Sequence, residues 1–292
     1  MRSLFALLLL PAFALAQTAD EKKATLKFID SLRDPETGAW AVSPPKDGEK
    51  LKPSLRAVNG AANAIKYFGG EVTDKEKVTK FVLSCYDEKT GAFAEPGDKP
   101  SVAMTSVGVL AATAVGIPKE KYKGAAKYVM DNCKAFEDFR IGAAAFEALG
   151  VKTDEDEFIR WMKEGVYTWS TQGGDPEATA ARGLASLAAM RLRLDANAMT
   201  GELKKTYSEM IQKGQKADGG WGKYDAKTSD AETTYRVMRA LMLMKEKPKD
   251  ADGVTKFVAS CRRKDGGYGV DAEAPSSMSG VYYAAKISEW NK

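Results

Sequence analysis

Histidine is absent from the 292-residue chain. It is the side chain that most often serves as a general base in enzymes, and it is also the commonest metal ligand. Its absence excludes Ser-His-Asp and Cys-His catalysis, together with every zinc site that needs an imidazole ligand. If the chain is an enzyme, carboxylates are the main candidates for a general base.

Cysteine is scarce. The chain has three cysteines, a small and odd number that does not indicate a disulfide framework. Cys85 and Cys261 each stand four residues after a phenylalanine, at Phe81 and Phe257. This position is typical of a small thiol packed at the end of a helix. We therefore expect buried thiols without chemistry, and Cys85 with Cys133 is the pair that neighbouring parts of the chain could bring together.

Outside the N-terminus, the chain has no long apolar run. After Arg2, residues 4–10 are apolar, and an Ala-Leu-Ala sequence ends at Ala16. The pattern is typical of a secretory signal peptide and is too short to span a bilayer. We expect residues 1–16 to be cleaved near Ala16, leaving a single domain over 17–292 that is exported to the periplasm or cell exterior. We do not expect the chain to span a membrane.

An excess of one charge is missing as well. The chain has 44 Lys and Arg residues against 40 Asp and Glu residues, and the two signs are interspersed. Because no basic stripe is present, nucleic acid is not an expected partner.

The chain does contain an internal repeat. The segment Lys27–Leu32 (KFIDSL) returns as KFVLSC at 80–85 and as KFVASC at 256–261. A turn of glycine followed by an aromatic residue comes after each copy, and a fourth such turn follows a weaker copy. We expect the four aromatics to fill space between the repeated units: Trp40, Phe93, Trp221 and Tyr268. A period of roughly 50 residues predicts stacked supersecondary units.

Each unit predicts a charged amphipathic helix, a glycine loop and a second helix rich in Ala and Gly. The first helices are expected at 20–33, 74–86, 119–134, 154–166, 199–214 and 250–263. The second helices are expected at 54–68, 101–115, 139–149, 177–194, 231–245 and 277–290. Helices without a charged face are buried on most sides. The pattern therefore predicts an all-α fold, an α/α toroid of six helix-hairpin repeats with inner and outer helical rings.

Two motifs connect the repeat with a known family. The first is a Phe-x3-Cys helix end, and the second is an Asp-Gly-Gly-aromatic loop, clearest at 218–222 and 265–269. The units resemble the repeat of protein prenyltransferase β-subunits and of squalene–hopene-type terpene cyclases. Residues 215–221 also fit the Gln-x3-Gly-x-Trp motif of those cyclases. The resemblance implies the toroid fold over nearly the whole mature chain, and an isoprenoid or lipid ligand.

The resemblance does not extend to the catalytic motifs. The prenyltransferases bind zinc through an Asp-x-Cys motif and a later histidine. Asp230 matches the aspartate, but Glu232 stands at the cysteine position and Ser277 and Met278 stand near the histidine position. The Asp-x-Asp-Asp acid motif of the cyclases is missing too. We therefore expect no zinc site and no cofactor.

Two acidic pairs open consecutive second helices: Asp175 with Glu177, and Asp230 with Glu232. We interpret them as helix caps, because Asp at the N-cap and Glu in the first turn satisfy free amides and complement the helix dipole. On this interpretation Glu232 acts through the dipole alone. The functional alternative is that both pairs line one mouth of the toroid, where they bind calcium or act as acid and base.

Polar side chains on the second helices are the candidates for ligand binding. An arginine on an apolar helix is costly unless it is paired or wet. Either these residues face a water-filled cavity, where arginines clamp an anion, or the arginines pair with helix-start carboxylates, such as Arg56 or Arg140 with Asp175 or Glu177. The candidates are Arg56, Asn59, Asn63, Arg140, Arg182, Tyr235, Arg236, Tyr282 and Tyr283.

Three functions fit the sequence. The first is an exported ligand-binding or scaffold toroid, with an isoprenoid, lipid or protein ligand in its central cavity. The second is a divergent prenyltransferase- or terpene-cyclase-like enzyme that acts on an isoprenoid or lipid. The third is a glycan-active enzyme, which needs two acids about 5–10 Å apart. The cavity lining discriminates between them: an aromatic funnel favours isoprenoid, facing acids favour glycan, and a filled centre favours a scaffold.

Overall fold

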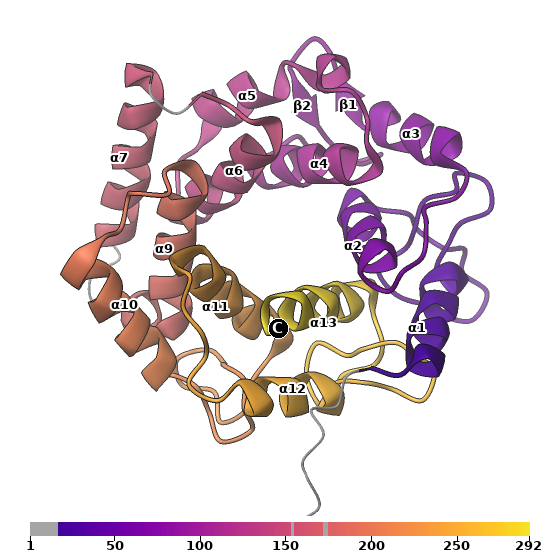
Figure 1. Ribbon diagram of the computed structural model, residues 1–292. Helices are drawn as coiled ribbons and strands as arrows, with labels where there is room; N and C mark the ends of the chain where they lie inside the picture. Colours follow the sequence, from indigo (N-terminus) through magenta and orange to yellow (C-terminus); the bar gives the residue numbers. More distant parts are fainter. Residues whose placement is uncertain (1–16, 153–154, 172–174) are drawn as a thin grey trace, which may run out of the picture.

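The computed structural model describes residues 17–152, 155–171 and 175–292 (Figure 1). The predicted signal peptide and the predicted first residue of the fourth outer helix, Asp154, lie outside the described residues. Within the described part the chain is helical, apart from one antiparallel pair of two-residue strands, β1 (Tyr86–Asp87) and β2 (Ala92–Phe93). None of the described helices is long and apolar enough to cross a bilayer.

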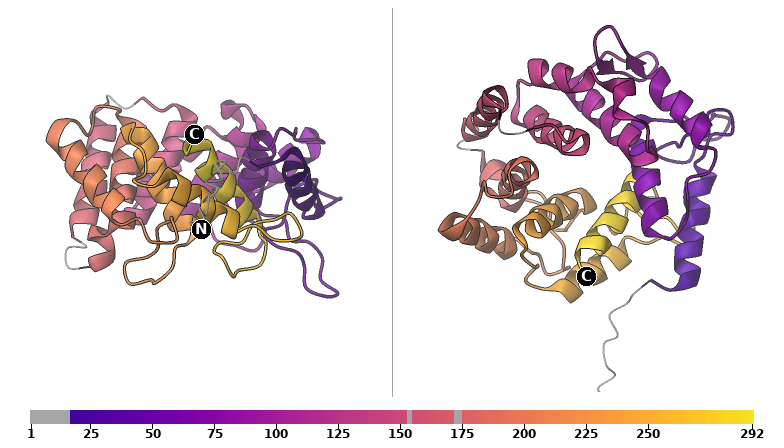
Figure 2. Two further views of the ribbon diagram at one scale, coloured as in Figure 1. Left: turned by 60° about the horizontal axis from the view of Figure 1, so that its bottom comes forward. Right: turned by 45° about the horizontal axis from the view of Figure 1, so that its top comes forward.

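The helices form two concentric rings (Figures 1 and 2). The inner ring consists of α2 (Leu55–Tyr67), α4 (Val102–Val115), α6 (Phe136–Leu149), α9 (Ala181–Leu194), α11 (Ala231–Met244) and α13 (Met278–Trp290). The outer ring consists of α1 (Ala19–Ser31), α3 (Lys75–Ser84), α5 (Ala125–Asn132), α7 (Asp156–Ser170), α10 (Gly201–Lys213) and α12 (Ala251–Ser260). Each inner helix packs on the next, and α13 packs on α2. The predicted α/α toroid is confirmed.

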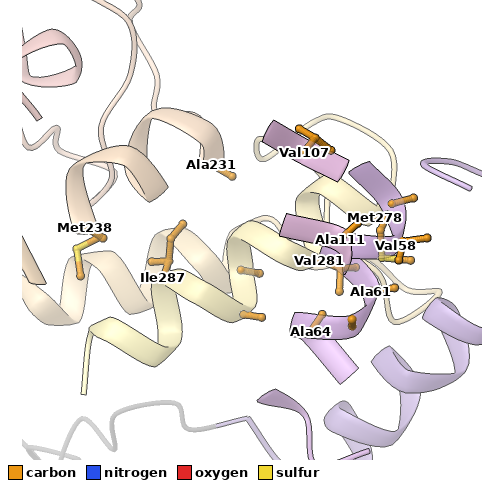
Figure 3. Packing of buried hydrophobic residues seen from close by; sticks show 14 of the residues in the cluster. Val58, Ala61, Ala64, Val107, Ala111, Ala231, Met238, Met278, Val281 and Ile287 are labelled. Atoms are coloured by element: carbon orange, nitrogen blue, oxygen red, sulfur yellow. The ribbon is translucent and has the colours of Figure 1, made fainter. Parts of the chain in front are cut away.

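Small side chains allow the inner helices to pack closely. Ala61 and Ala64 of α2 are fully buried beside Ala111 of α4 and Met278 of α13, as Figure 3 shows. A Cβ atom at Gly60 would lie 3.1 Å from the Met278 side chain. Packing of this density leaves no room for larger residues at these contacts. The Ala-rich composition of the second helices therefore positions the inner ring.

The aromatic of each glycine turn is buried between an outer and an inner helix. Trp40, Phe93, Trp221 and Tyr268 are at most 2% exposed. The Trp221 indole N–H donates to the Ile211 carbonyl of α10 at 2.8 Å, and the Trp221 backbone N–H donates to Thr234 Oγ1 of α11 at 2.9 Å. These contacts fit the expected space-filling role.

The turn glycines also join each unit to the next. Gly219 has φ +93°, and a Cβ there would lie 2.0 Å from the Gly253 carbonyl oxygen of α12. Gly266 has φ +88°, and its Cβ would lie 2.5 Å from the Ala24 carbonyl oxygen of α1. Glycine satisfies both the left-handed backbone and the close approach. Because Gly266 belongs to the last unit and Ala24 to the first, this contact closes the ring.

The third unit differs from its prediction at both helices. The expected outer helix 119–134 is split into a short 3-10 helix, η1 (Lys119–Tyr122), and α5, with Gly124 between them. The turn at Gly91 packs on Gly124, whose N–H donates to the Tyr86 hydroxyl at 3.0 Å. The inner helix α6 starts at Phe136, three residues before the predicted start.

Side-chain capping and a close approach explain these altered bounds. The Asp138 carboxylate accepts the backbone N–H groups of Lys134 and Ala135, both at 3.1 Å, and so fixes an early start for α6. The expected helix 177–194 is also split, into α8 (Pro176–Thr179) and α9. A Cβ at Gly183 would lie 2.1 Å from the Ala178 carbonyl oxygen, so this glycine permits the break.

The three cysteines are free thiols. Cys85 and Cys261 are buried directly after α3 and α12, and Cys133 is half-buried after α5. Burial raises the pKa of Cys85 and of Cys261 to about 11, and that of Cys133 to about 12. The thiolate form, which is the nucleophile, is therefore scarce near neutral pH.

Because Gly266 packs tightly on α1, adding a single methyl group there should disturb ring closure and lower the free energy of unfolding. Gly97 has φ +90° but no atom within 4 Å of an added Cβ, so Gly97→Ala should lose about 1–2 kcal/mol for the left-handed backbone alone. Gly266→Ala should lose at least about 1 kcal/mol more, because its methyl group meets α1. Urea unfolding of both variants measures the difference, and equal losses would contradict a tight closure between the last and first units.

Candidate functional site

The inner ring surrounds a central cavity of about 630 Å³. This volume lies within the range of small-molecule sites, about 300–1,000 Å³. Its lining combines apolar residues of α4, polar residues of α2 and charged or aromatic residues of the other inner helices. The lining that matters for its chemistry is Arg56, Asn59, Asn63, Val107, Leu110, Glu137, Arg140, Glu147, Arg193, Glu232, Tyr235, Arg236, Arg239, Tyr282, Tyr283, Lys286 and Trp290.

Helical spacing brings the charged residues to the cavity face. On α11, Glu232, Arg236 and Arg239 are separated by four and three residues, so they lie on one face of the helix. On α6, Arg140 and Glu147 are seven residues apart, which is about two turns. The charged face that α6 and α11 turn to the cavity is thus narrow, and the buried residues of both helices are mostly apolar.

Glu137 is the centre of a first group of ion pairs. Its carboxylate accepts from the Arg140 guanidinium at 2.8 Å and from the Arg236 guanidinium at 2.9 Å. Arg236 also donates to Glu232 at 2.7 Å. Arg236 is only 9% exposed, and these two carboxylates from α6 and α11 satisfy its charge. The pairs therefore join α6 to α11, the two helices on either side of α9, as well as lining the cavity.

The predicted acidic helix starts lie around an arginine. Asp175 and Asp230 are caps: they accept the backbone N–H groups of Glu177 at 2.9 Å and of Thr233 at 2.7 Å. Arg182 lies between Glu177, at 3.6 Å, and Glu232, at 3.4 Å. Of the four acids, Glu232 lines the central cavity.

One expectation for these residues is wrong: Glu232 acts through ion pairs with Arg182 and Arg236, not through the helix dipole alone. The alternative that an arginine pairs with helix-start carboxylates holds for Arg182. The example pairs, Arg56 or Arg140 with Asp175 or Glu177, are not formed within the described residues. Arg140 pairs with Glu137, which lies one turn before it on α6, and Arg56 has no ion pair within the described residues. The register of neighbouring inner helices decides these partners.

A second group of ion pairs joins α6, α9 and α11 near their C-terminal ends. Arg239 donates to both carboxylate oxygens of Glu147, at 2.6 and 2.7 Å, and Arg193 donates to the same carboxylate at 2.9 Å. These three residues and Glu137 were not predicted from the sequence. The helical spacing of Glu137 and Glu147 from Arg140, of Arg239 from Glu232 and of Arg193 from Arg182 was a signal that could have found them.

Aromatic side chains of α11 and α13 form one wall of the cavity. The Tyr235 ring lies 5.2 Å from the rings of Tyr283 and Trp290 and 5.4 Å from that of Tyr282, measured between centroids. The hydroxyls of Tyr235 and Tyr282 are hydrogen-bonded at 3.1 Å. The Arg239 guanidinium lies over the Trp290 ring at 5.4 Å. This wall offers apolar surface with a charged edge.

Glu137 and Glu232 are ionised at neutral pH. Burial raises the pKa of Glu137, but Arg140 and Arg236 outweigh burial and lower it to about 2. Burial likewise raises the pKa of Glu232, and Arg236 and Arg182 lower it below its ordinary value. A general acid needs a proton near the operating pH. Neither carboxyl group is suited to donate one.

No three His, Cys, Asp or Glu side chains are grouped as a metal site within residues 17–152, 155–171 and 175–292. Around Glu177 and Glu232, the positive partner is Arg182. The expectation of no zinc site stays a prediction, and calcium at the acidic helix starts stays an alternative.

Comparisons with known proteins agree on the fold. A family profile described as "Prenyltransferase alpha-alpha toroid domain" matches residues 1–161 and 175–291. A comparison with curated proteins finds no match. Among solved structures, a glycosidase in complex with glucose aligns with a TM-score of 0.60 and 11% identity, covering 97% of this chain and 99% of its own. The type II terpene cyclase MstE from Scytonema, with geranylgeranyl dihydroxybenzoate, aligns with a TM-score of 0.55 and 11% identity, covering 94% and 96%. Identities this low show the fold alone.

The ion pairs of Glu137 predict a pH-dependent stability. Because the folded-state pKa is depressed, the stabilisation is complete above the unfolded pKa of about 4.3 and is lost as pH falls towards about 2. Glu137→Gln should lower the free energy of unfolding by about 1–2 kcal/mol at pH 7, a modest loss because the side chain is 53% exposed and solvent screens it. The loss should shrink at pH 3, measured by urea unfolding.

Glu164 is the matched control, an exposed residue of α7 with no ion pair within the described chain. Glu164→Gln should leave stability unchanged at pH 7. If Glu137→Gln loses the same free energy at pH 3 as at pH 7, its ion pairs are not the source of the effect.

Proposed function

Because the chain belongs to the family of prenyltransferase alpha-alpha toroid domains, we propose that it is a ligand-binding toroid whose central cavity takes a small anionic amphiphile. One observation carries this proposal. The cavity carboxylates are held in ion pairs with arginines, whereas Arg56, which also lines the cavity, is exposed and has no ion pair in the described residues. The site thus offers a free cation to a ligand.

An open cavity supports binding over a scaffold role. A toroid with a purely architectural role needs no polar centre, and a filled centre would bury more apolar surface. Here about 630 Å³ is enclosed by the inner helices. Placing charged residues at the centre costs stability unless they are paired or wet. A binding function explains why the ring retains them.

The distribution of side chains supports an amphiphile. Val107 and Leu110 of α4 and the aromatic wall of α11 and α13 provide apolar surface. Arg56 lies on α2, which packs between α4 and α13. A ligand with an apolar body and one carboxylate, sulfonate or phosphate group satisfies both surfaces at once. Isoprenoid and lipid acids belong to this class.

The solved neighbours fit this class in part. The terpene cyclase is described with geranylgeranyl dihydroxybenzoate as its substrate, a molecule that joins a hydrocarbon chain to a benzoate. The glycosidase neighbour raises the possibility of glycan chemistry. Glycan hydrolysis requires one protonated carboxylic acid, and the lowered pKa values of Glu137 and Glu232 weigh against that role. The N-terminal pattern adds the proposal that binding takes place outside the cytoplasm.

A pair of fluorescent probes tests the proposal. 1-Anilinonaphthalene-8-sulfonate is an anionic amphiphile, and N-phenyl-1-naphthylamine is a neutral molecule of similar shape. We expect one saturable site for the sulfonate, and Arg56→Gln should weaken its binding about tenfold, since a hydrogen bond to a charged group contributes about 1.5–3 kcal/mol. Fluorescence titration of the wild type and the variant gives both dissociation constants.

The neutral probe is the control for the cavity's shape. Arg56→Gln should leave its affinity unchanged, because that probe has no charge to lose a partner. Equal affinity of both proteins for the sulfonate would contradict the assignment of Arg56. Conversion of a linear isoprenoid into a cyclised or transferred product by the wild type would favour the enzyme alternative instead.

A further inference from the structure

A second, much smaller cavity lies between α6, α9 and α11. Its volume is about 20 Å³, enough for one particle of the size of a water molecule. Four guanidinium groups contribute to its lining, and no carboxylate does. The lining residues are Arg140, Ser186, Ala189, Arg193, Tyr235, Arg236 and Arg239.

The charges around this cavity do not balance. In the first group of ion pairs, three arginines meet three glutamates: Arg140, Arg182, Arg236, Glu137, Glu177 and Glu232. In the second group, Arg193 and Arg239 share the single carboxylate of Glu147. The network as a whole therefore carries one surplus positive charge, and the surplus belongs to the second group.

Nearby charges do not pair with Arg193 or Arg239 in the described residues. Lys286, another cation of the central cavity, pairs with Glu289 at 2.9 Å. The Asp138 carboxylate stays charged but accepts backbone N–H groups at the start of α6, nine residues or about 13 Å before Glu147. The surplus thus stays with Arg193 and Arg239, next to the arginines of the first group.

Hydrogen-bond donors and electrostatics at the small cavity point to an anion. The Arg239 Nε is buried and has no hydrogen-bond partner within the described chain, a costly state for a charged donor. Burial lowers the pKa of Arg239, and the neighbouring Arg193 lowers it further. Burial and Arg236 act on the pKa of Arg140 in the same way. Like charges are crowded here.

We propose that the small cavity binds one monovalent inorganic anion of halide size, for which chloride is the probe. One such anion between the four arginines neutralises the surplus charge and supplies an acceptor to the unpartnered Nε–H of Arg239. It also connects α6, α9 and α11, the three inner helices that carry the ion-pair network. A halide matches the size of the single particle that this volume holds.

Thermal unfolding in matched salts tests this site. The melting temperature of the ligand-free wild type should rise saturably in sodium chloride, by about 3 °C or more over sodium gluconate at equal ionic strength, because a ligand of the native state stabilises it. Arg193→Gln removes the surplus charge and leaves Glu147 paired with Arg239. This variant should lose the chloride response. Arg160→Gln, on the exposed face of α7, should keep it.

The variant Tyr235→Phe tests whether the negative charge at the small cavity comes from a bound anion or from a Tyr235 phenolate. Burial raises the pKa of Tyr235, but the adjacent arginines, first Arg193, lower it overall. If the anion is chloride, Tyr235→Phe keeps the four arginines and should keep the response. If chloride affects only Tyr235→Phe and not the wild type, the Tyr235 phenolate supplies the charge and the proposal is wrong.

A direct measurement covers the case in which Arg193→Gln does not fold. Chloride NMR lines should broaden on addition of wild-type protein, and bromide added in excess over chloride should reduce the broadening. Wild-type melting temperatures that are equal in chloride and gluconate, or equal chloride responses in Arg193→Gln and Arg160→Gln, would overturn the site. Neither result depends on Arg56, so this proposal and the amphiphile site fail separately.

Discussion

The cavity exists because six inner helices of small residues close into a ring while α6, α9 and α11 turn narrow charged faces towards its centre. Close packing at positions such as Ala61 and Ala64 fixes the helices at short distances. The charged faces then meet at the centre, where water is limited and an unpaired charge is costly. Arg236, between carboxylates of α6 and α11, illustrates the solution. The ring brings α6, α9 and α11 together, and the ion-pair network then joins these three helices around the cavity.

The architecture could be predicted from the sequence because the repeated pattern of a charged helix and an Ala-rich helix indicates an outer and an inner ring. Glycine turns mark four of the six units, and the structure places Gly219 and Gly266 against the next unit's outer helix. The third unit was predicted less well, since its bounds depend on contacts that the repeat does not encode. The Asp138 cap moves the start of α6, and the turn at Gly91 interrupts the preceding helix at Gly124.

The candidate site was only partly predictable, for a related reason. Polar residues on otherwise apolar helices identified Arg56, Arg140, Arg236 and the tyrosines as cavity residues, and all of these line it. Their partners come from other helices, and the relative register of two helices cannot be read from either one alone. Glu147 pairs with arginines 46 and 92 positions away in the chain. Family membership predicts the ring of helices. The ion pairs between helices determine the charges that line its cavity.

Native mass spectrometry of the protein, purified without detergent, tests the central claim most directly. The claim is that the ring holds a small anionic amphiphile in its polar cavity. We predict a fraction of the protein with one bound non-protein mass, released as an anion on activation, and a smaller such fraction in Arg56→Gln. A bound neutral sugar, or the bare chain alone in both proteins, would contradict the account.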